Sequence, residues 1–191
     1  MALPSWVASD EDKPAPMPLL LVQAFVNTWD VDKDTDLLLN TDSAGAWMRE
    51  AELIGPATTL SPADLQVARE VRESFRALLA HNAGGPAPTP HDLEPLERLT
   101  RSNDARVSVD PTGLVHLGPK QPGRIEDVLL GLVLVIRDAQ ELGTWQRLKI
   151  CGNTDCRWAF YDRSHSRRGT WCDMATCGNL IKNRNLRARR R

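Results

Sequence analysis

The sequence predicts a mainly α-helical N-terminal domain with a short β-hairpin, followed by a small C-terminal finger made of a knuckle, a hairpin and a helix. Three observations predict this fold class. Apolar residues recur at helical spacing in several segments of the first three quarters of the chain. All four cysteines lie in the last quarter of the 191 residues, grouped two and two. The basic residues are concentrated around the cysteines.

Length and composition divide the chain into three parts. A chain of 191 residues can hold one sizeable domain and a small one. Residues 1–18 are rich in proline and acidic residues, which predicts a disordered or extended tail. We expect the helical domain to span residues 19–145 and the finger to span residues 146–191.

The helical domain opens with three predicted helices. Apolar side chains at helical spacing indicate helices over residues 19–29 and 43–54. The third helix has the clearest start signal, because Ser61 offers a capping hydroxyl, Pro62 suits the first helical position and Asp64 suits the third. A connection rich in glycine and proline ends this helix after residue 82.

The second half of the domain contains a hairpin between two helices. A short helix is expected over residues 92–101, with Pro95 disturbing its first turn. β-Branched residues alternate in residues 106–109 and 114–117 around a turn sequence, which predicts a β-hairpin. Residues 124–142 are the most hydrophobic segment and should form a helix in the centre of the core.

Charge is distributed unevenly along the chain. From residue 146 to residue 191 there are twelve Lys or Arg and three acidic residues, a net charge of +9. The other 145 residues carry a net charge of −10. This asymmetry predicts a basic segment that binds polyanions and an acidic body that does not. The alternative is that the two parts neutralise each other within the fold.

The cysteine spacing predicts one metal site. Four residues separate the members of each cysteine pair, and Zn²⁺ held by four thiolates needs two short clamps of this kind. Reduced thiols and two disulfides are the alternatives. The N-terminus lacks the basic start and apolar run of a signal peptide, so we expect a cytoplasmic protein, in which disulfides are rare. We therefore predict one structural zinc ion with the ligands Cys151, Cys156, Cys172 and Cys177.

The finger should be built around these cysteines. Gly152 and Asn153 suit the tight turn of the first knuckle. A strand over residues 158–161 and a return strand over residues 170–172 should then form a hairpin, and residues 176–189 should form a helix. This order is similar to that of a treble-clef or zinc-ribbon-like finger.

The finger also resembles a known family. Its residues read Cys151-x4-Cys156-Arg-Trp-x-Phe-Tyr-Asp-Arg-Ser and, later, Trp171-Cys172-x-Met-Ala-x-Cys177-Gly-Asn179. They closely resemble the bacterial CGNR zinc fingers, named for a Cys-Gly-Asn-Arg tetrad at the last ligand. The resemblance implies that all four cysteines bind zinc. This chain departs from the tetrad at Leu180, so a contact of the family arginine would be lost or pass to Lys182 or Arg184.

The helical part resembles a second family. Phe25-Val-Asn-Thr28 and, later, Asp36-Leu-Leu resemble the opening of the ABATE domain, which is described as a stress-induced transcription regulator. The resemblance implies a bacterial transcription regulator. We expect its helical domain to sense a small-molecule effector or to form a homodimer. Asn27, Trp29 and Trp47 are candidates for lining an effector pocket, although both tryptophans also suit an ordinary core.

The basic residues of the finger are the candidates for binding nucleic acid. In the last predicted helix, Arg184, Arg187 and Arg191 follow Leu180 at steps of four, three and four, so they share one face. We favour DNA over RNA. The alternatives are an RNA-binding finger, a protein-interaction module with a purely structural zinc ion, and a solvated tail without a partner. The full candidate set is Arg157, Arg163, Arg167, Arg168, Lys182, Arg184, Arg187, Arg189, Arg190 and Arg191.

The sequence does not predict an enzyme or a membrane protein. It contains no P-loop, G-x-G-x-x-G, H-E-x-x-H or G-x-S-x-G motif, and a four-thiolate zinc site has no open position for water. The longest apolar run, residues 128–136, is too short to span a bilayer.

Overall fold

The fold was analysed in a computed structural model of the chain. The structure describes residues 3–120 and 123–189, apart from the side chains at positions 185 and 189. Helices dominate it, which confirms the predicted fold class. Five helices form the body: α1 (Leu19–Val26), α2 (Thr41–Glu50), α3 (Pro62–Asn82), α4 (Pro90–Ser102) and α5 (Ile125–Glu141).

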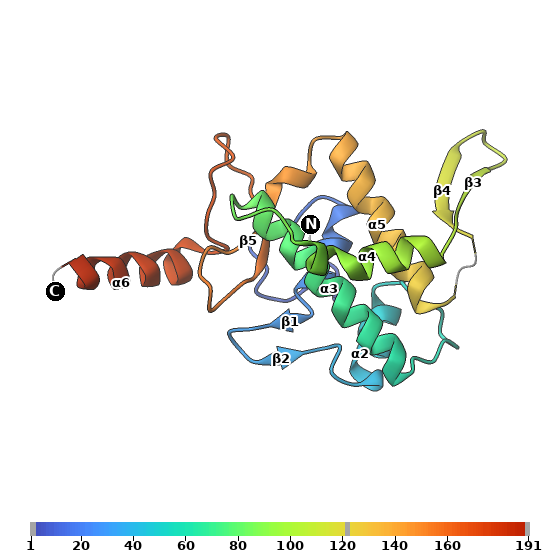
Figure 1. Ribbon diagram of the computed structural model, residues 1–191, viewed down its shortest axis with the longest axis horizontal. Helices are drawn as coiled ribbons and strands as arrows, with labels where there is room; N and C mark the ends of the chain where they lie inside the picture. The colour runs from blue at the N-terminus through green and yellow to red at the C-terminus, as the bar shows by residue number, and fades with distance from the viewer. Residues whose placement is uncertain (1–2, 121–122, 190–191) are drawn as a thin grey trace.

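The remaining elements are short. Three antiparallel hairpins pair β1 (Trp29–Asp30) with β2 (Thr35–Asp36), β3 (Ala105–Val109) with β4 (Val115–Pro119), and β5 (Leu148–Ile150) with β6 (Ala159–Tyr161). A 3₁₀ turn, η1 (Trp145–Arg147), precedes β5, and a π-helical turn, η2 (Met174–Gly178), precedes the last helix, α6 (Asn179–Arg189). Figure 1 shows α6 projecting from one end of the body and the β3–β4 hairpin from the other.

Helix starts in the body follow local capping chemistry. Ser61 Oγ accepts a hydrogen bond from Asp64 N, and the Asp64 carboxylate accepts one from Ser61 N, so the predicted capping box is present. The same reciprocal box links Thr89 and Asp92 at the start of α4, which continues through Pro95. Asn40 caps α2 and starts it two residues before the predicted position.

One core holds the helices and the last hairpin together. Phe25 of α1 packs edge-on against Phe75 of α3, with ring centroids 5.9 Å apart. Leu129 and Leu132 of α5 are fully buried in the same cluster. The cluster continues into the β5–β6 hairpin through the buried side chains of Leu148, Ile150, Ala159 and Tyr161. This hairpin is therefore part of the core of the body.

Two predicted elements were wrong in detail. Helix α1 ends at Val26, where Thr28 Oγ1 donates to the carbonyl of Phe25, and Trp29 pairs with Asp36 in the first hairpin. The return strand predicted for residues 170–172 does not form. The partner of β6 is β5, which precedes the first cysteine, and the carbonyl of residue 170 instead accepts a hydrogen bond from Gly152 N.

The N-terminal segment lies between the body and the finger. Residues 3–18 contain neither helix nor strand, yet Val7, Glu11 and Ala15 are buried. The buried amide of Gln23 accepts a hydrogen bond from Ala15 N and donates to the carbonyls of Lys13 and Ala159.

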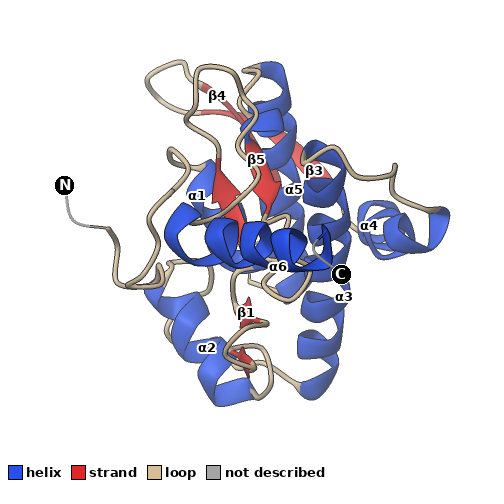
Figure 2. Ribbon diagram, turned by 90° about the vertical axis from the view of Figure 1, so that its left-hand side faces the viewer, coloured by secondary structure: helices blue, strands red, loops and turns tan. Residues whose placement is uncertain are grey.

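Figure 2, viewed from the α6 end, shows α6 in front of the body. Within the described residues, no helix is both long and apolar enough to cross a membrane.

Candidate metal centre and basic surface

The four cysteines converge on one point. Cys151 follows β5, Cys156 lies in the loop that leads to β6, Cys172 precedes η2, and Cys177 lies within it. Their sulfurs all lie within 4.8 Å of one another. The Sγ atoms are 3.7 Å apart for Cys156 and Cys172 and 3.8 Å apart for Cys172 and Cys177. Zn–S bonds of about 2.3 Å in a tetrahedron place the sulfurs about 3.8 Å apart, so this donor set fits one structural zinc ion.

Most of the site is shielded from solvent. Cys151, Cys156 and Cys177 are each at most 9% exposed, and the indoles of Trp158 and Trp171 pack against them in a small cluster separate from the main core. Asn153 Nδ2 donates to Cys177 Sγ at 3.6 Å, a contact that stabilises negative charge on the sulfur. Bound zinc supplies a cross-link between chain segments here, with no coordination position left for a reaction.

Two glycines permit the close packing of this cluster. A Cβ atom at Gly152 would lie 2.8 Å from Thr170 Cγ2 and 3.1 Å from the Trp171 ring. A Cβ atom at Gly178 would lie 2.5 Å from Met174 Sδ. Gly152 follows Cys151 and faces the segment that leads to Cys172, so a larger residue there would push one cysteine clamp away from the other, whereas at Gly178 it would clash within the second clamp.

The thiols favour a cation electrostatically. Hydrogen bonds from Cys156 and Cys172 lower the pKa of Cys151. The shared hydrogen bond with Cys151 raises the pKa of Cys156, and the pKa of Cys172 is raised for the same reason. Without a cation, one thiolate therefore opposes ionisation of its neighbours. A divalent metal ion removes this opposition, and its binding releases protons.

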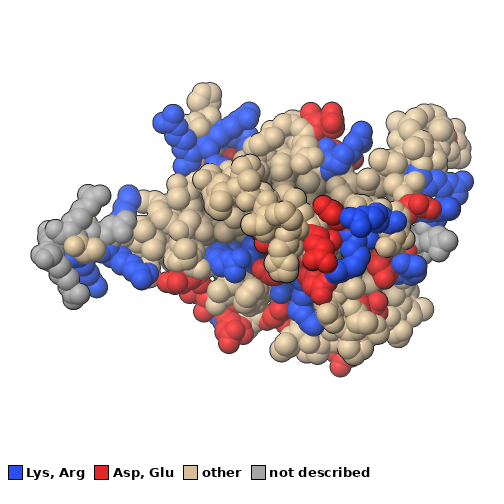
Figure 3. All heavy atoms as spheres, viewed as in Figure 1, with Lys and Arg blue, Asp and Glu red and all other residues tan. Residues whose placement is uncertain are grey.

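An acidic hollow borders the metal site on the side of the N-terminal segment. Its lining includes Cys156 and Cys172 together with Asp10, Asp30 and Asp32. Lys33 pairs there with Asp10 at 2.7 Å and with Asp30 at 3.0 Å. Figure 3 shows acidic side chains gathered below the finger. This side of the finger repels polyanions.

A basic loop follows β6. Lys149 Nζ pairs with the Asp162 carboxylate at 2.9 Å in a buried ion pair and also donates to the carbonyl of Arg167 at 2.6 Å. Gly169 N donates to the same carboxylate at 2.7 Å, so both ends of the loop are attached to one carboxyl group. The side chains of Arg167 and Arg168 are exposed on this loop.

The second basic element is helix α6. Leu180, Arg184 and Arg187 line one hollow along the helix, so they share one face as the sequence spacing indicated. Leu180 is 53% exposed, and Arg184 makes only a loose pair with Asp155 at 3.5 Å. Lys182 is exposed as well. Figure 3 shows basic side chains on α6 and on the upper side of the finger.

Other basic candidates are placed differently. Arg157 is directed towards the body, where its carbonyl accepts a hydrogen bond from Arg76 and its guanidinium lies 3.9 Å from Glu73. Arg163 donates to the carbonyl of Pro14 at 2.7 Å. The side chain of Arg189, together with Arg190 and Arg191, lies outside the described residues.

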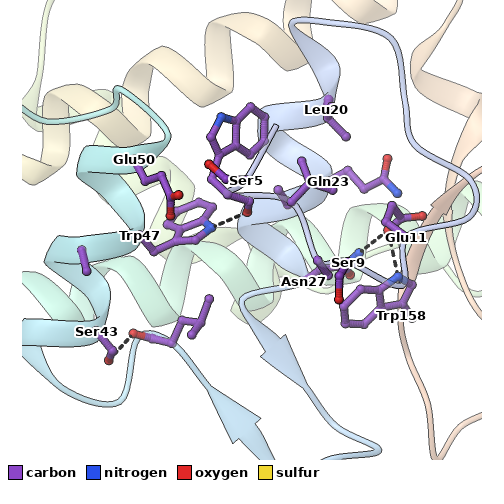
Figure 4. A pocket seen from close by; sticks show the side chains of 16 residues that line it. Ser5, Ser9, Glu11, Leu20, Gln23, Asn27, Ser43, Trp47, Glu50 and Trp158 are labelled. Carbon is purple, nitrogen blue, oxygen red and sulfur yellow. Dashed lines mark hydrogen bonds between the residues drawn. The ribbon is translucent and has the colours of Figure 1, made fainter. Parts of the chain in front are cut away.

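The three candidate effector residues lie in two different parts of the structure. Asn27 and Trp47 line one cavity, which is shown in Figure 4. Trp29 lies elsewhere, with its ring 5.4 Å from the guanidinium carbons of Arg72 and Arg76. The cavity is also lined by Trp6, Glu11 and Trp158, which sequence reasoning missed. No local pattern connects these residues, because two lie in the N-terminal segment and one in the finger.

Zinc binding is directly testable. We expect one zinc ion per chain, with four sulfur neighbours at about 2.3 Å in X-ray absorption. Cys172→Ser should lower zinc affinity sharply and reduce the helical signal of α6, whereas Ser166→Ala on the exposed part of the basic loop should change neither. A protein that folds fully with far less than one zinc ion per chain, or with oxygen and nitrogen ligands, would contradict this assignment.

The Lys149–Asp162 pair gives a pH-dependent prediction. Burial by itself raises the pKa of Asp162, but hydrogen bonds from Lys149, Ser164 and Gly169 outweigh it and hold this pKa well below its usual range. Asp162→Asn should lower the free energy of unfolding at pH 7 by about 3 kcal/mol, because Lys149 keeps a buried charge without its partner. The exposed change Asp12→Asn should have little effect.

The sign of the pH dependence follows from the lowered pKa. The carboxylate of Asp162 stabilises the fold fully above its unfolded-state pKa of about 4, and this contribution is lost as the pH falls through the folded-state value. The difference in unfolding free energy between wild type and Asp162→Asn should therefore be constant near neutral pH and shrink in acid. Chemical denaturation of the two zinc-loaded proteins over a pH series measures this difference, and a pH-independent difference would refute the assignment.

Two protein families match the chain. The CGNR zinc finger matches residues 147–190, which contain all four cysteines. ABATE, described as "Putative stress-induced transcription regulator", matches residues 20–144, well over half of the chain. The search of curated proteins found no match to this chain. The chain therefore belongs to the ABATE family and carries a C-terminal CGNR zinc finger.

Proposed function

We propose that this protein is a zinc-dependent DNA-binding regulator of bacterial transcription, in which the finger contacts duplex DNA and the helical body senses a small molecule. The observation that carries the proposal is the charge arrangement around the metal site. Arg167 and Arg168 on the loop and Arg184 and Arg187 on α6 are exposed, while the acidic hollow lies towards the N-terminal segment and reaches α6 only at Leu180. A polyanion can approach only the basic side at low electrostatic cost.

The aromatic residues of the finger favour duplex DNA over single-stranded RNA. Phe160 and Tyr161 are buried in the packed hairpin, and Trp158 and Trp171 are half-buried because they pack against the cysteines. Stacking on unpaired bases requires exposed aromatic faces. Arginines on a projecting helix can contact phosphates without any exposed aromatic face.

Three further expectations remain part of the proposal. The role is regulatory rather than catalytic, in agreement with the two matched families. A cytoplasmic location suits cysteines that act as zinc thiolates. The homodimer stays a prediction, and the surface that it would most usefully cover is the β3–β4 hairpin, where Val107, Val109 and Val115 are well exposed.

The two α6 arginines provide the main test. Duplex DNA, structured RNA and single-stranded DNA should be titrated with zinc-loaded protein over a salt series, with fluorescence anisotropy as the readout. Arg184→Gln combined with Arg187→Gln should weaken duplex binding and make the log–log salt slope shallower by about two units, one for each phosphate contact. Arg101→Gln, an exposed change on α4, is the matched control and should leave the slope unchanged.

At Leu180 a positive charge can be added to α6 instead of removed. It lies on the same exposed face as Arg184 and Arg187, at the position where CGNR fingers have their arginine. Leu180→Arg should tighten duplex binding and make the slope steeper by about one unit. Equal binding of all three nucleic acids would contradict a DNA regulator. Absence of binding at low salt would leave the interaction module as the better function.

A further inference from the structure

The cavity between the N-terminal segment and the body has the size of a small-molecule site. Its volume is about 520 Å³, within the range of pockets that hold metabolites. The lining comes from the N-terminal segment, α1, α2 and, through Trp158, the finger. Figure 4 shows Trp47 on one side of the cavity and Glu11 with Trp158 on the other.

The walls of the cavity are rich in indole rings. Three of the six tryptophans in the chain, Trp6, Trp47 and Trp158, line it. The ring of Trp47 is fixed, because it is buried and its Nε1 donates to the carbonyl of Trp6 at 2.9 Å. Trp158 is fixed by a 2.9 Å hydrogen bond from its Nε1 to the carboxylate of Glu11. Rigid indoles of this kind attract positive charge.

All the charged residues that line the cavity are acidic. They are Glu11 and Glu50, and none of the described lining residues is Lys, Arg or His. Glu11 is only 7% exposed, and burial raises its pKa. Its carboxylate accepts hydrogen bonds from Trp158, Asn27 and Lys13 N, but within the described residues no cationic side chain forms an ion pair with it. When it is ionised, the Glu11 carboxylate is therefore a buried negative charge without a cationic side chain paired to it.

We propose that this cavity binds a small organic ammonium ion, held between the indoles and balanced by the Glu11 carboxylate. An ammonium group uses both features, since aromatic rings and a desolvated carboxylate each favour cations. A neutral apolar ligand of the same shape would leave the charge of Glu11 unbalanced, and an anion would be repelled by it. Trp158 connects the cavity to the finger only two residues after Cys156, so the bound cation acts as the effector of the proposed function.

The binding test uses charge as its only variable. Zinc-loaded full-length protein should be titrated with tetramethylammonium, with choline and with 3,3-dimethyl-1-butanol, the neutral carbon analogue of choline, at constant ionic strength. Isothermal calorimetry and tryptophan fluorescence report binding. Both ammonium ions should bind saturably in the millimolar range or below, and choline should bind at least about tenfold more tightly than the alcohol.

Variants locate the binding. Glu11→Gln retains an acceptor for Trp158 Nε1 but removes the charge, and it should weaken choline binding at least about tenfold. Glu50→Gln should weaken it less, because Glu50 is exposed. Glu141→Gln removes an exposed charge from α5 and is the matched control. If Glu11→Gln loses zinc or helical signal, Trp6→Leu replaces it and should give a similar loss of choline binding.

Three outcomes would overturn the inference: equal binding of choline and its neutral analogue, unchanged choline binding in folded Glu11→Gln, or no saturable binding of either ammonium ion. These outcomes are independent of the DNA titrations. Choline binding without DNA binding would remove the proposed regulator and keep the site, whereas DNA binding without ammonium binding would remove only the site.

Discussion

The β5–β6 hairpin is shared between the helical core and the zinc site, and the arrangement of the rest of the molecule depends on this sharing. Leu148 and Ala159 are fully buried in the core of the body. Cys151 and Cys156 lie in the loop that joins the same two strands. The amides of Gln23 and Asn27 both donate to the carbonyl of Ala159, and Asn27 also accepts from Ala159 N. One face of the hairpin is thus held by burial and hydrogen bonds, which are independent of metal.

The core and the metal therefore hold different parts of the finger in place. The core fixes the position of the first cysteine pair, and zinc then attaches the second pair, with η2 and α6, to that position. Because α6 has little packing of its own, the metal site is its main connection to the body. The Lys149–Asp162 pair attaches the basic loop to the same hairpin. The two basic elements are consequently held on one support, which would keep their spacing constant against a polyanion.

Sequence reasoning succeeded where local chemistry decides the structure. The capping signal at Ser61 and the helical periodicity of residues 124–142 both correspond to helices of the structure. Cysteine spacing predicted the zinc site, because two short clamps admit few other arrangements. The return strand of the finger was wrong because strand pairing is a long-range property: residues 158–161 pair with the segment before the first cysteine, and no local signal distinguishes the two partners.

The role of the N-terminal segment could not be predicted for a related reason. Its prolines and acidic residues are typical of a disordered or extended tail, and only the folded chain brings Glu11 next to Trp158, 147 positions away. Asn27 and Trp47 were identified by residue type as candidates for a pocket, and they do line one cavity. Trp29 has the same residue type but packs on two arginines, which shows that type without position does not define a site.

Hydrogen exchange with and without zinc tests the shared hairpin most directly. Amide exchange should be measured by mass spectrometry on the zinc-loaded protein and on the same protein after chelation. We predict that exchange accelerates strongly in residues 171–189, whereas the amide of Tyr161, which donates to the carbonyl of Lys13, stays protected together with α1 and α3. Loss of protection in β5 and β6 together with α6 would contradict a hairpin held by the core, because the finger would then be an independent unit that folds only around its metal.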